Sequence, residues 1–198
     1  MISEIWMLLL VTSIFGFIPS LTSYSVYIHD KPFSSIDAIN ICKCKYLTKI
    51  NVTNSSTKLL PSRFLVNCHS LETLILSKNE IMEITHDTFN DLSNLLTLDL
   101  SRNHITTLPK DVFKPLTNLI ILVLNRNRIE MIDSNLFLHN QYLFHLDISD
   151  NNLKTIEPKS FRMLEYLYFL NMYNNPSLNS TDFLYDDRYV PSSINMAN

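Results

Sequence analysis

Glycine is almost absent from this chain, with Gly16 as the single example among 198 residues. Phosphate-binding loops need several glycines, because a backbone that lacks a Cβ must approach the phosphate closely. The sequence therefore excludes nucleotide-binding loops of that kind. Turns in the folded part must use asparagine, aspartate and serine, which adopt left-handed backbone geometry less readily than glycine does. We expect modest stability from that choice.

Patterns for catalysis and metal binding are missing as well. The sequence contains no His-x-x-x-His, no paired-cysteine metal motif and no Gly-x-Ser-x-Gly. The adjacent pair His86 and Asp87 is interpreted as an ordinary solvated turn. The six histidines fall at irregular places: His29, His69, His86, His104, His139 and His145. We predict that the protein is not an enzyme and has no catalytic residues, no metal and no cofactor.

Neither charge nor cysteine is abundant. The formal net charge is −3 and 46% of residues are hydrophobic, which argues against a disordered chain and against nucleic-acid binding. The three cysteines are Cys42, Cys44 and Cys68, and an odd count in a secreted chain leaves one thiol unpaired or pairing between chains. Cys42 and Cys44 point to opposite sides of an extended segment, so they are not expected to pair together. Either one of them pairs with Cys68, or Cys68 fills an apolar position in the core.

A long hydrophobic run occurs only at the start of the chain. The uncharged stretch from Ile5 to Ile18 spans 14 residues, which is short for a membrane span and suitable for the core of a signal peptide. We predict a signal peptide over residues 1–23, cleaved near Thr22 or Ser23, and a secreted product or a piece of a longer protein. Because Glu4 is acidic and no basic residue precedes the run, an uncleaved signal anchor is the alternative. No second run reaches membrane length.

Leucine, in contrast, recurs at a fixed spacing of 24 residues between Leu71 and Asn175. Two leucines that lie two residues apart point to the same face of a short strand, and the later Ile and Phe turn the chain back over that face. One such coil cannot bury enough surface alone, so neighbouring coils must stack with their strands parallel. A buried asparagine amide can satisfy turn backbone groups that would otherwise lose their partners. The asparagine column is Asn79, Asn103, Asn127, Asn151 and Asn175.

The motif L-x-x-L-x-L-x-x-N-x-[IL] resembles the signature of leucine-rich repeats, and the spacing with a late Phe is similar to the extracellular subclass. The resemblance implies a leucine-rich repeat solenoid, an α/β-class horseshoe, with parallel strands on the concave face and loops with short 3-10 turns on the convex face. It also implies a binding module similar to the ectodomains of Toll-like receptors, Slit-like proteins and small proteoglycans. The cysteine-containing flank before the repeats resembles the N-terminal cap of that family, although the family usually brings four cysteines there.

Four regions follow from these patterns. Residues 1–23 form the leader, and 24–70 form an N-terminal cap with one degenerate repeat that starts at Leu47 and carries Ser55 in the asparagine column. Residues 71–175 hold four complete repeats and a partial fifth, and 176–198 form an improvised C-terminal cap or a truncated tail. The triplets at Asn51, Asn54 and Asn179 have the form of glycosylation acceptors, which agrees with secretion.

Residues between the core leucines should line the concave face, where solenoids of this kind bind their partners. Apolar groups at these positions predict a ligand-binding patch of Ile121, Val123, Phe169 and Tyr173, unless the tail packs over the last two. A basic ladder of Lys78, Arg102 and Arg126 is either balanced by Asp99 and Asp147 or attracts an acidic ligand. We therefore predict a secreted or cell-surface module for a protein or glycan ligand, with no nucleic acid as partner. The alternative is a matrix component that binds acidic polysaccharide.

Overall fold

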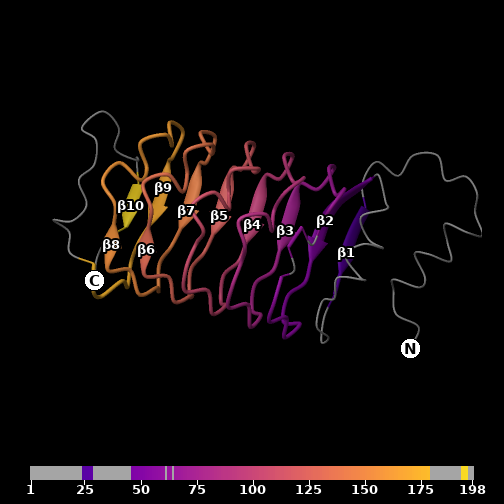
Figure 1. Ribbon diagram of the computed structural model, residues 1–198, viewed down its shortest axis with the longest axis horizontal. Coiled ribbons are helices and arrows are strands. Elements are labelled where there is room, and N and C mark those ends of the chain that lie inside the picture. The colour runs from indigo at the N-terminus through magenta and orange to yellow at the C-terminus, as the bar shows by residue number, and fades with distance from the viewer. Residues whose placement is uncertain (1–23, 29–45, 61, 64, 179–192, 196–198) are drawn as a thin grey trace, which may run out of the picture.

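The computed structural model describes residues 24–28, 46–60, 62–63, 65–178 and 193–195, and these residues form a solenoid of stacked coils (Figure 1). Eight strands form one parallel sheet in the order β1-β2-β3-β4-β5-β7-β9-β10. The predicted leucine-rich repeat solenoid is therefore confirmed. The strands are β1 (Tyr24–Tyr27), β2 (Leu47–Asn51), β3 (Thr73–Ile75), β4 (Thr97–Asp99), β5 (Ile121–Val123), β7 (His145–Asp147), β9 (Phe169–Asn171) and β10 (Ser193–Asn195).

The 24-residue spacing of the sequence reappears as the register of this sheet. Leu74 lies opposite Leu98, Leu98 opposite Leu122, and Leu122 opposite Leu146. Identical positions in consecutive coils thus stack directly on each other, because each strand feeds a loop of the same length before the next strand begins. Turns in those loops are closed by hydrogen bonds over three residues, such as Thr88 N to Thr85 O at 3.1 Å.

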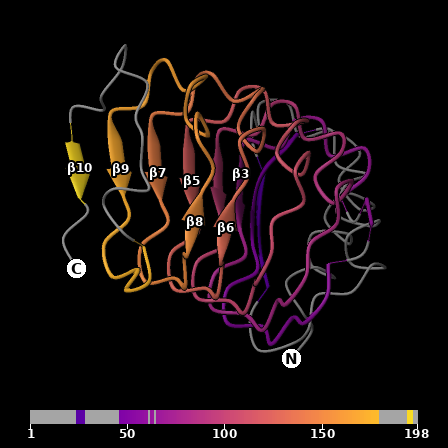
Figure 2. The same ribbon diagram turned by 60° about the vertical axis from the view of Figure 1, so that its left-hand side comes forward.

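A second, smaller sheet lies on the convex side of the last full coils (Figure 2). Strand β6 (Met131–Ile132) pairs in parallel with β8 (Thr155–Ile156), and an isolated parallel bridge joins Leu59 to Glu83 at the equivalent place in earlier coils. The sequence pattern indicated loops and short turns on this face, so these strands are a difference from the prediction.

Both ends of the main sheet extend beyond the repeats that the sequence pattern identified. Val26 in β1 lies opposite Ile50, and Ser193 in β10 lies opposite Phe169, so each end keeps the 24-residue register. Strand β2 begins at Leu47, and Leu47, Ile50 and Val52 are all buried. The predicted leader, Cys42, Cys44, Asn179 and most of the tail lie outside the described residues.

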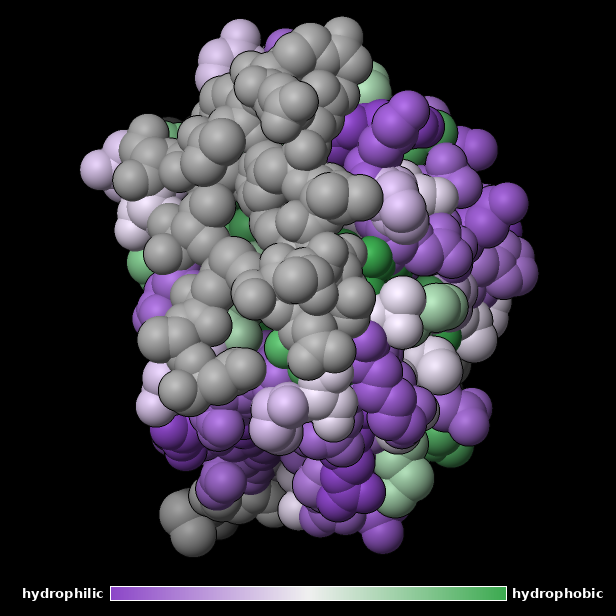
Figure 3. All heavy atoms as spheres, turned by 90° about the vertical axis from the view of Figure 1, so that its left-hand side faces the viewer, coloured by the Kyte–Doolittle hydropathy of each residue, from purple (hydrophilic) through white to green (hydrophobic). Residues whose placement is uncertain are grey.

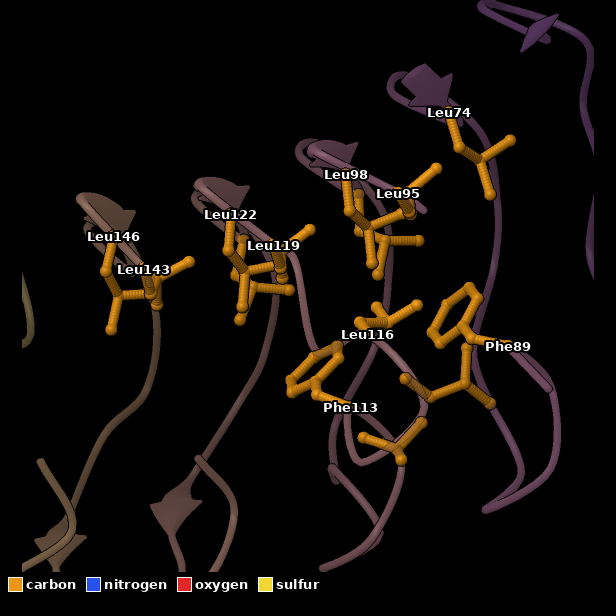
Figure 4. Packing of buried hydrophobic residues seen from close by; sticks show 14 of the residues in the cluster. Leu74, Phe89, Leu95, Leu98, Phe113, Leu116, Leu119, Leu122, Leu143 and Leu146 are labelled. Atoms are coloured by element: carbon orange, nitrogen blue, oxygen red, sulfur yellow. The ribbon is translucent and has the colours of Figure 1, made fainter. Parts of the chain in front are cut away.

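The core consists of columns of leucine behind the strands and a column of phenylalanine nearer the convex loops (Figure 4). Leu74, Leu98, Leu122 and Leu146 have no exposed surface. Consecutive rings of Phe89, Phe113, Phe137 and Phe161 stack at centroid distances of 6.3, 6.0 and 5.9 Å. Replacing one such interior leucine by alanine typically costs about 2–5 kcal/mol, so each column anchors its coil to both neighbours.

The asparagine column hydrogen-bonds the turns of adjacent coils together. Asn103 donates through Nδ2 to the carbonyls of Leu76, Leu100 and Ser101 at 3.0, 2.9 and 3.2 Å, and its Oδ1 accepts the Ile81 N–H at 3.1 Å. The same arrangement recurs, with small variations, at Asn79, Asn127, Asn151 and Asn175. One buried amide thus satisfies backbone groups of two neighbouring coils.

Left-handed backbone geometry is frequent, as the lack of glycine requires. In each repeat the residue before the column asparagine has positive φ: Lys78, Arg102, Arg126, Asp150 and Asn174, with values of 52–57°. The expectation that asparagine, aspartate and serine would fill such positions was wrong for the first three. A left-handed residue other than glycine costs roughly 1–2 kcal/mol, so the hydrogen bonds of the adjacent asparagine offset that strain.

Candidate binding site on the concave face

The concave face is built from the outward positions of the three-residue strands. In β3, β4, β5, β7 and β9 the central residue is buried and its two neighbours are half-buried. Period-two alternation in a strand produces this pattern, because successive side chains point to opposite faces. The face therefore carries two rows of solvent-facing side chains that run across the sheet.

One row is apolar and aromatic over three adjacent strands. Ile121, His145 and Phe169 lie opposite one another in β5, β7 and β9. The rings of His145 and Phe169 stack with centroids 4.4 Å apart and planes 17° from parallel. Burial of the imidazole lowers the pKa of His145 and outweighs the nearby Asp147 carboxylate, which raises it. The His145 ring is therefore neutral at physiological pH, and it lies between the predicted site residues Ile121 and Phe169.

His145 was absent from the predicted patch because the histidines were treated as irregular in position. Its place in the 24-residue register, midway between Ile121 and Phe169, was the signal that could have found it. Val123 lies in the second row beside this group, opposite Asp147. Tyr173 lies beyond the end of β9, where it is 46% exposed, so it borders the group rather than joining it. We name Ile121, Val123, His145 and Phe169 the concave patch.

The two aspartates of the second row are turned toward their own backbone. The Asp99 carboxylate accepts the Ser101 N–H at 2.9 Å, and the Asp147 carboxylate accepts the N–H and hydroxyl of Ser149 at 3.0 and 2.6 Å. Neither aspartate makes an ion pair with the basic ladder among the described residues. The expectation that they would balance the ladder was therefore wrong, since the turn hydrogen bonds hold them.

The basic ladder is balanced at one end by a different carboxylate. Arg126 Nε lies 3.3 Å from Asp150, which occupies the same position one coil later, while Asn174 Nδ2 donates to Asp150 at 2.7 Å. The Asn174 hydrogen bond and then Arg126 lower the pKa of Asp150 despite its partial burial. Lys78 and Arg102 are exposed and form no ion pair within the part of the chain that the structure describes.

A family model described as leucine rich repeat matches residues 69–129 and 117–176, which together cover more than half of the chain. The chain belongs to the leucine-rich repeat family. Its structure is similar to a solved chain in a crystal structure of a TLR13–ssRNA13 complex, with a TM-score of 0.66 and 29% sequence identity. That similarity covers 77% of this chain but 20% of the solved chain, so this repeat protein spans about one fifth of its relative's length. No curated protein matches it.

The leucine-rich repeat coils also carry exposed aromatic pairs that the sequence analysis missed. Phe144 and Tyr168 stack at 5.1 Å, and Tyr142 and Tyr166 at 5.8 Å, just before β7 and β9. Each of the four side chains is 46–57% exposed. The members of each pair are 24 residues apart, so the spacing that identified the repeats could also have found them.

At the β10 end, the described surface is mostly hydrophilic with separated hydrophobic patches (Figure 3).

The remaining predicted residues are placed as follows. Cys68 is buried, with 4% of its surface exposed, and its sulfur is not free; its candidate partners Cys42 and Cys44 lie outside the described residues. Asn51 ends β2 on the concave face, and Asn54 is exposed in the following turn. The described residues contain no group of three potential metal ligands. Nor does any helix among them reach the length and apolarity of a membrane span.

Proposed function

We propose that this leucine-rich repeat chain is a secreted or cell-surface module that binds a protein or glycan ligand through the concave patch, in the manner of a receptor ectodomain. The observation that carries the proposal is the unbroken row of Ile121, His145 and Phe169 across three strands. Half-buried apolar and aromatic groups on a solvated sheet favour partner contact, because a ligand removes them from water. The apolar leader and the glycosylation triplets support a secretory route.

The TLR13 chain of the similar structure is in complex with ssRNA, which raises the question of a nucleic-acid ligand here. The second concave row argues against it, because Asp99 and Asp147 place carboxylates in that row. Phosphate groups would be repelled at these positions, and nucleic-acid affinity depends mainly on cationic contacts to phosphates. A ligand with apolar or hydroxyl-bearing surface fits the patch better.

The test of this proposal compares charge insertions on the patch with matched insertions elsewhere on the same face. Phe169→Asp and Val123→Asp should each strongly reduce capture of partners from native secretions by the immobilised chain. Truncation of a central contact residue commonly costs 2 kcal/mol or more, so affinity should fall by about 30-fold or more. Thr73→Asp, at the row position equivalent to Phe169, serves as the control and should change little. Unchanged capture by both patch variants would remove the proposed site.

A second candidate function rests on the basic ladder. Lys78 and Arg102 are exposed and carry no ion pair among the described residues, so an acidic polysaccharide is the ligand class that would neutralise them. Binding to heparin should weaken steeply as salt rises, because exposed charges are screened over roughly 8–10 Å near physiological ionic strength. Retention on heparin that persists in the Arg102→Glu plus Arg126→Glu double variant would exclude this function.

A further inference from the structure

Asn51 differs from the other residues of its row in combining an amide with a hydroxyl two residues later. Its Oδ1 accepts hydrogen bonds from both the backbone N–H and the hydroxyl of Thr53. Asp99 and Asp147 make similar turns but have no amide nitrogen, and Asn171 is followed by Tyr173 at the hydroxyl position. The Asn51 side chain is half-buried on the concave face, and Nδ2 donates no hydrogen bond within the described residues.

The overlapping acceptor triplet at Asn54 has less suitable geometry. Asn54 and Ser56 both have left-handed backbones, with φ of 59° and 50°. Ser55 between them is buried, and its hydroxyl donates to Ile28 O at 2.9 Å. No hydrogen bond joins the Ser56 hydroxyl to the Asn54 amide in the described structure. Of the two triplets, therefore, Asn51-Val52-Thr53 is the one in which the hydroxyl already contacts the amide.

We propose that Asn51 carries an N-linked glycan, and that this glycan covers the β1–β3 end of the concave face and leaves β5 to β9 for the ligand. The reaction joins Asn51 Nδ2 to C1 of the first N-acetylglucosamine of a lipid-diphosphate-linked oligosaccharide. The C1–O bond to the diphosphate breaks, the diphosphate leaves with the electron pair, and Nδ2 loses one proton. The inference rests on the secretory route and the concave ligand of the proposed function.

The neighbours of Asn51 suit a sugar. Tyr27 in β1 and Ile75 in β3 are its direct partners across the sheet. Tyr27 is 47% exposed, and a tyrosine ring offers both an apolar face for sugar C–H groups and a polar tip. Parallel strands lie about 4.8 Å apart, so one pyranose ring spans the gap between Asn51 and either partner. The apolar group at Ile75 is then covered by carbohydrate instead of ligand.

Site occupancy is tested on the full chain secreted from animal cells. Peptide N-glycosidase in ¹⁸O-water converts a glycosylated asparagine to labelled aspartate, which mass spectrometry locates. The label should appear at Asn51, disappear in Thr53→Ala, survive in Thr53→Ser, and survive in the matched control Asn54→Gln. A label at Asn54 with none at Asn51, a label confined to Asn179, or no label at all would overturn the proposal.

Coverage of the face is tested by hydroxyl-radical footprinting before and after removal of the glycan. Oxidation of Tyr27 should rise several-fold on removal, while Tyr173, which is similarly exposed near the other end, should not change. Equal oxidation of Tyr27 in both forms would refute the coverage. This outcome is independent of ligand capture: if Phe169→Asp still captured partners, the proposed function would fail while the labelling and footprinting results stood.

Discussion

The hydrogen bonds of Asn103 lead to a sharp prediction about stability. In Asn103→Ala the Ile81 N–H loses the one acceptor that the described structure gives it, at a buried site. The three carbonyls that Asn103 contacts are less affected, because each keeps another donor: Asn79 Nδ2 for Leu76, Asn127 Nδ2 for Leu100, and Lys78 N for Ser101. An orphaned buried donor costs about 1–3 kcal/mol, and the weakened carbonyl contacts bring the expected loss to about 2–3 kcal/mol.

Urea unfolding monitored by circular dichroism measures that loss, with Asn152→Ala as the matched control. Asn152 is exposed and should change the free energy of unfolding by less than about 0.5 kcal/mol. Hydrogen exchange adds a local measurement, since the Ile81 amide should exchange at least about tenfold faster while the Ile105 amide, held by Asn127, does not. The reasoning is refuted if Asn103→Ala costs no more than Asn152→Ala, or if both amides accelerate equally.

Three further predictions follow from other positions. Asn140→Leu should cost about 1–2 kcal/mol in urea unfolding, because the buried Asn140 Nδ2 donates to the carbonyls of Phe113 and Leu116 at 3.0 and 2.8 Å, and leucine removes both hydrogen bonds. Unchanged or increased stability would contradict this prediction. Lys159→Gly should stabilise the protein by about 0.5 kcal/mol, because φ is 68° there, whereas Lys159→Val should destabilise it. The hydrogen bond from Asn174 is the main reason that the pKa of Asp150 lies below its ordinary value of 3.8. The Asp150 carboxylate therefore stabilises the folded chain fully above about pH 4, and this stabilisation is lost as the pH falls through the lowered pKa. The difference in Tm between the native chain and Asp150→Asn should accordingly shrink on acidification, and a constant difference would exclude this role.

The repeated columns were predictable because they obey one spacing and one physical rule. Leu74, Leu98 and Leu122 had to share a face, and a column asparagine had to be buried to be useful, so the fold followed from the sequence. The strands at the ends were harder to predict. The repeat motif is not recognisable in the sequences of β1 and β10 themselves, so only the register, which the structure displays, links Val26 to Ile50 and Ser193 to Phe169.

Three of the four residues of the concave patch could be named from the sequence, because the strand pattern identifies the solvent-facing positions. Ile121, Val123 and Phe169 were apolar residues at solvent-facing positions, and the strand pattern places such positions without knowledge of contacts. His145 required knowledge of the ring stacking at 4.4 Å that makes it part of the same surface. The roles of Asp99 and Asp147 depended on competition between an arginine and a nearby backbone N–H. In the short turn after each strand, the aspartate carboxylate accepts the backbone N–H two residues later and does not pair with an arginine.

The spacing of the phenylalanine rings has a consequence for the size of any partner. Rings stack at 5.9–6.3 Å, whereas neighbouring strands of a sheet lie about 4.8 Å apart. The coils are therefore spaced more widely at the ring column than at the main sheet, and the stack curves toward the sheet. With roughly 10 Å between the ring column and the sheet, the concave arc has a radius of about 4 nm. A rounded object of comparable curvature can touch many coils at once, while a flat one meets only the rims. For the ligand that we propose, the buried aromatic rings thus set the curvature of the surface that it meets, although they never touch it.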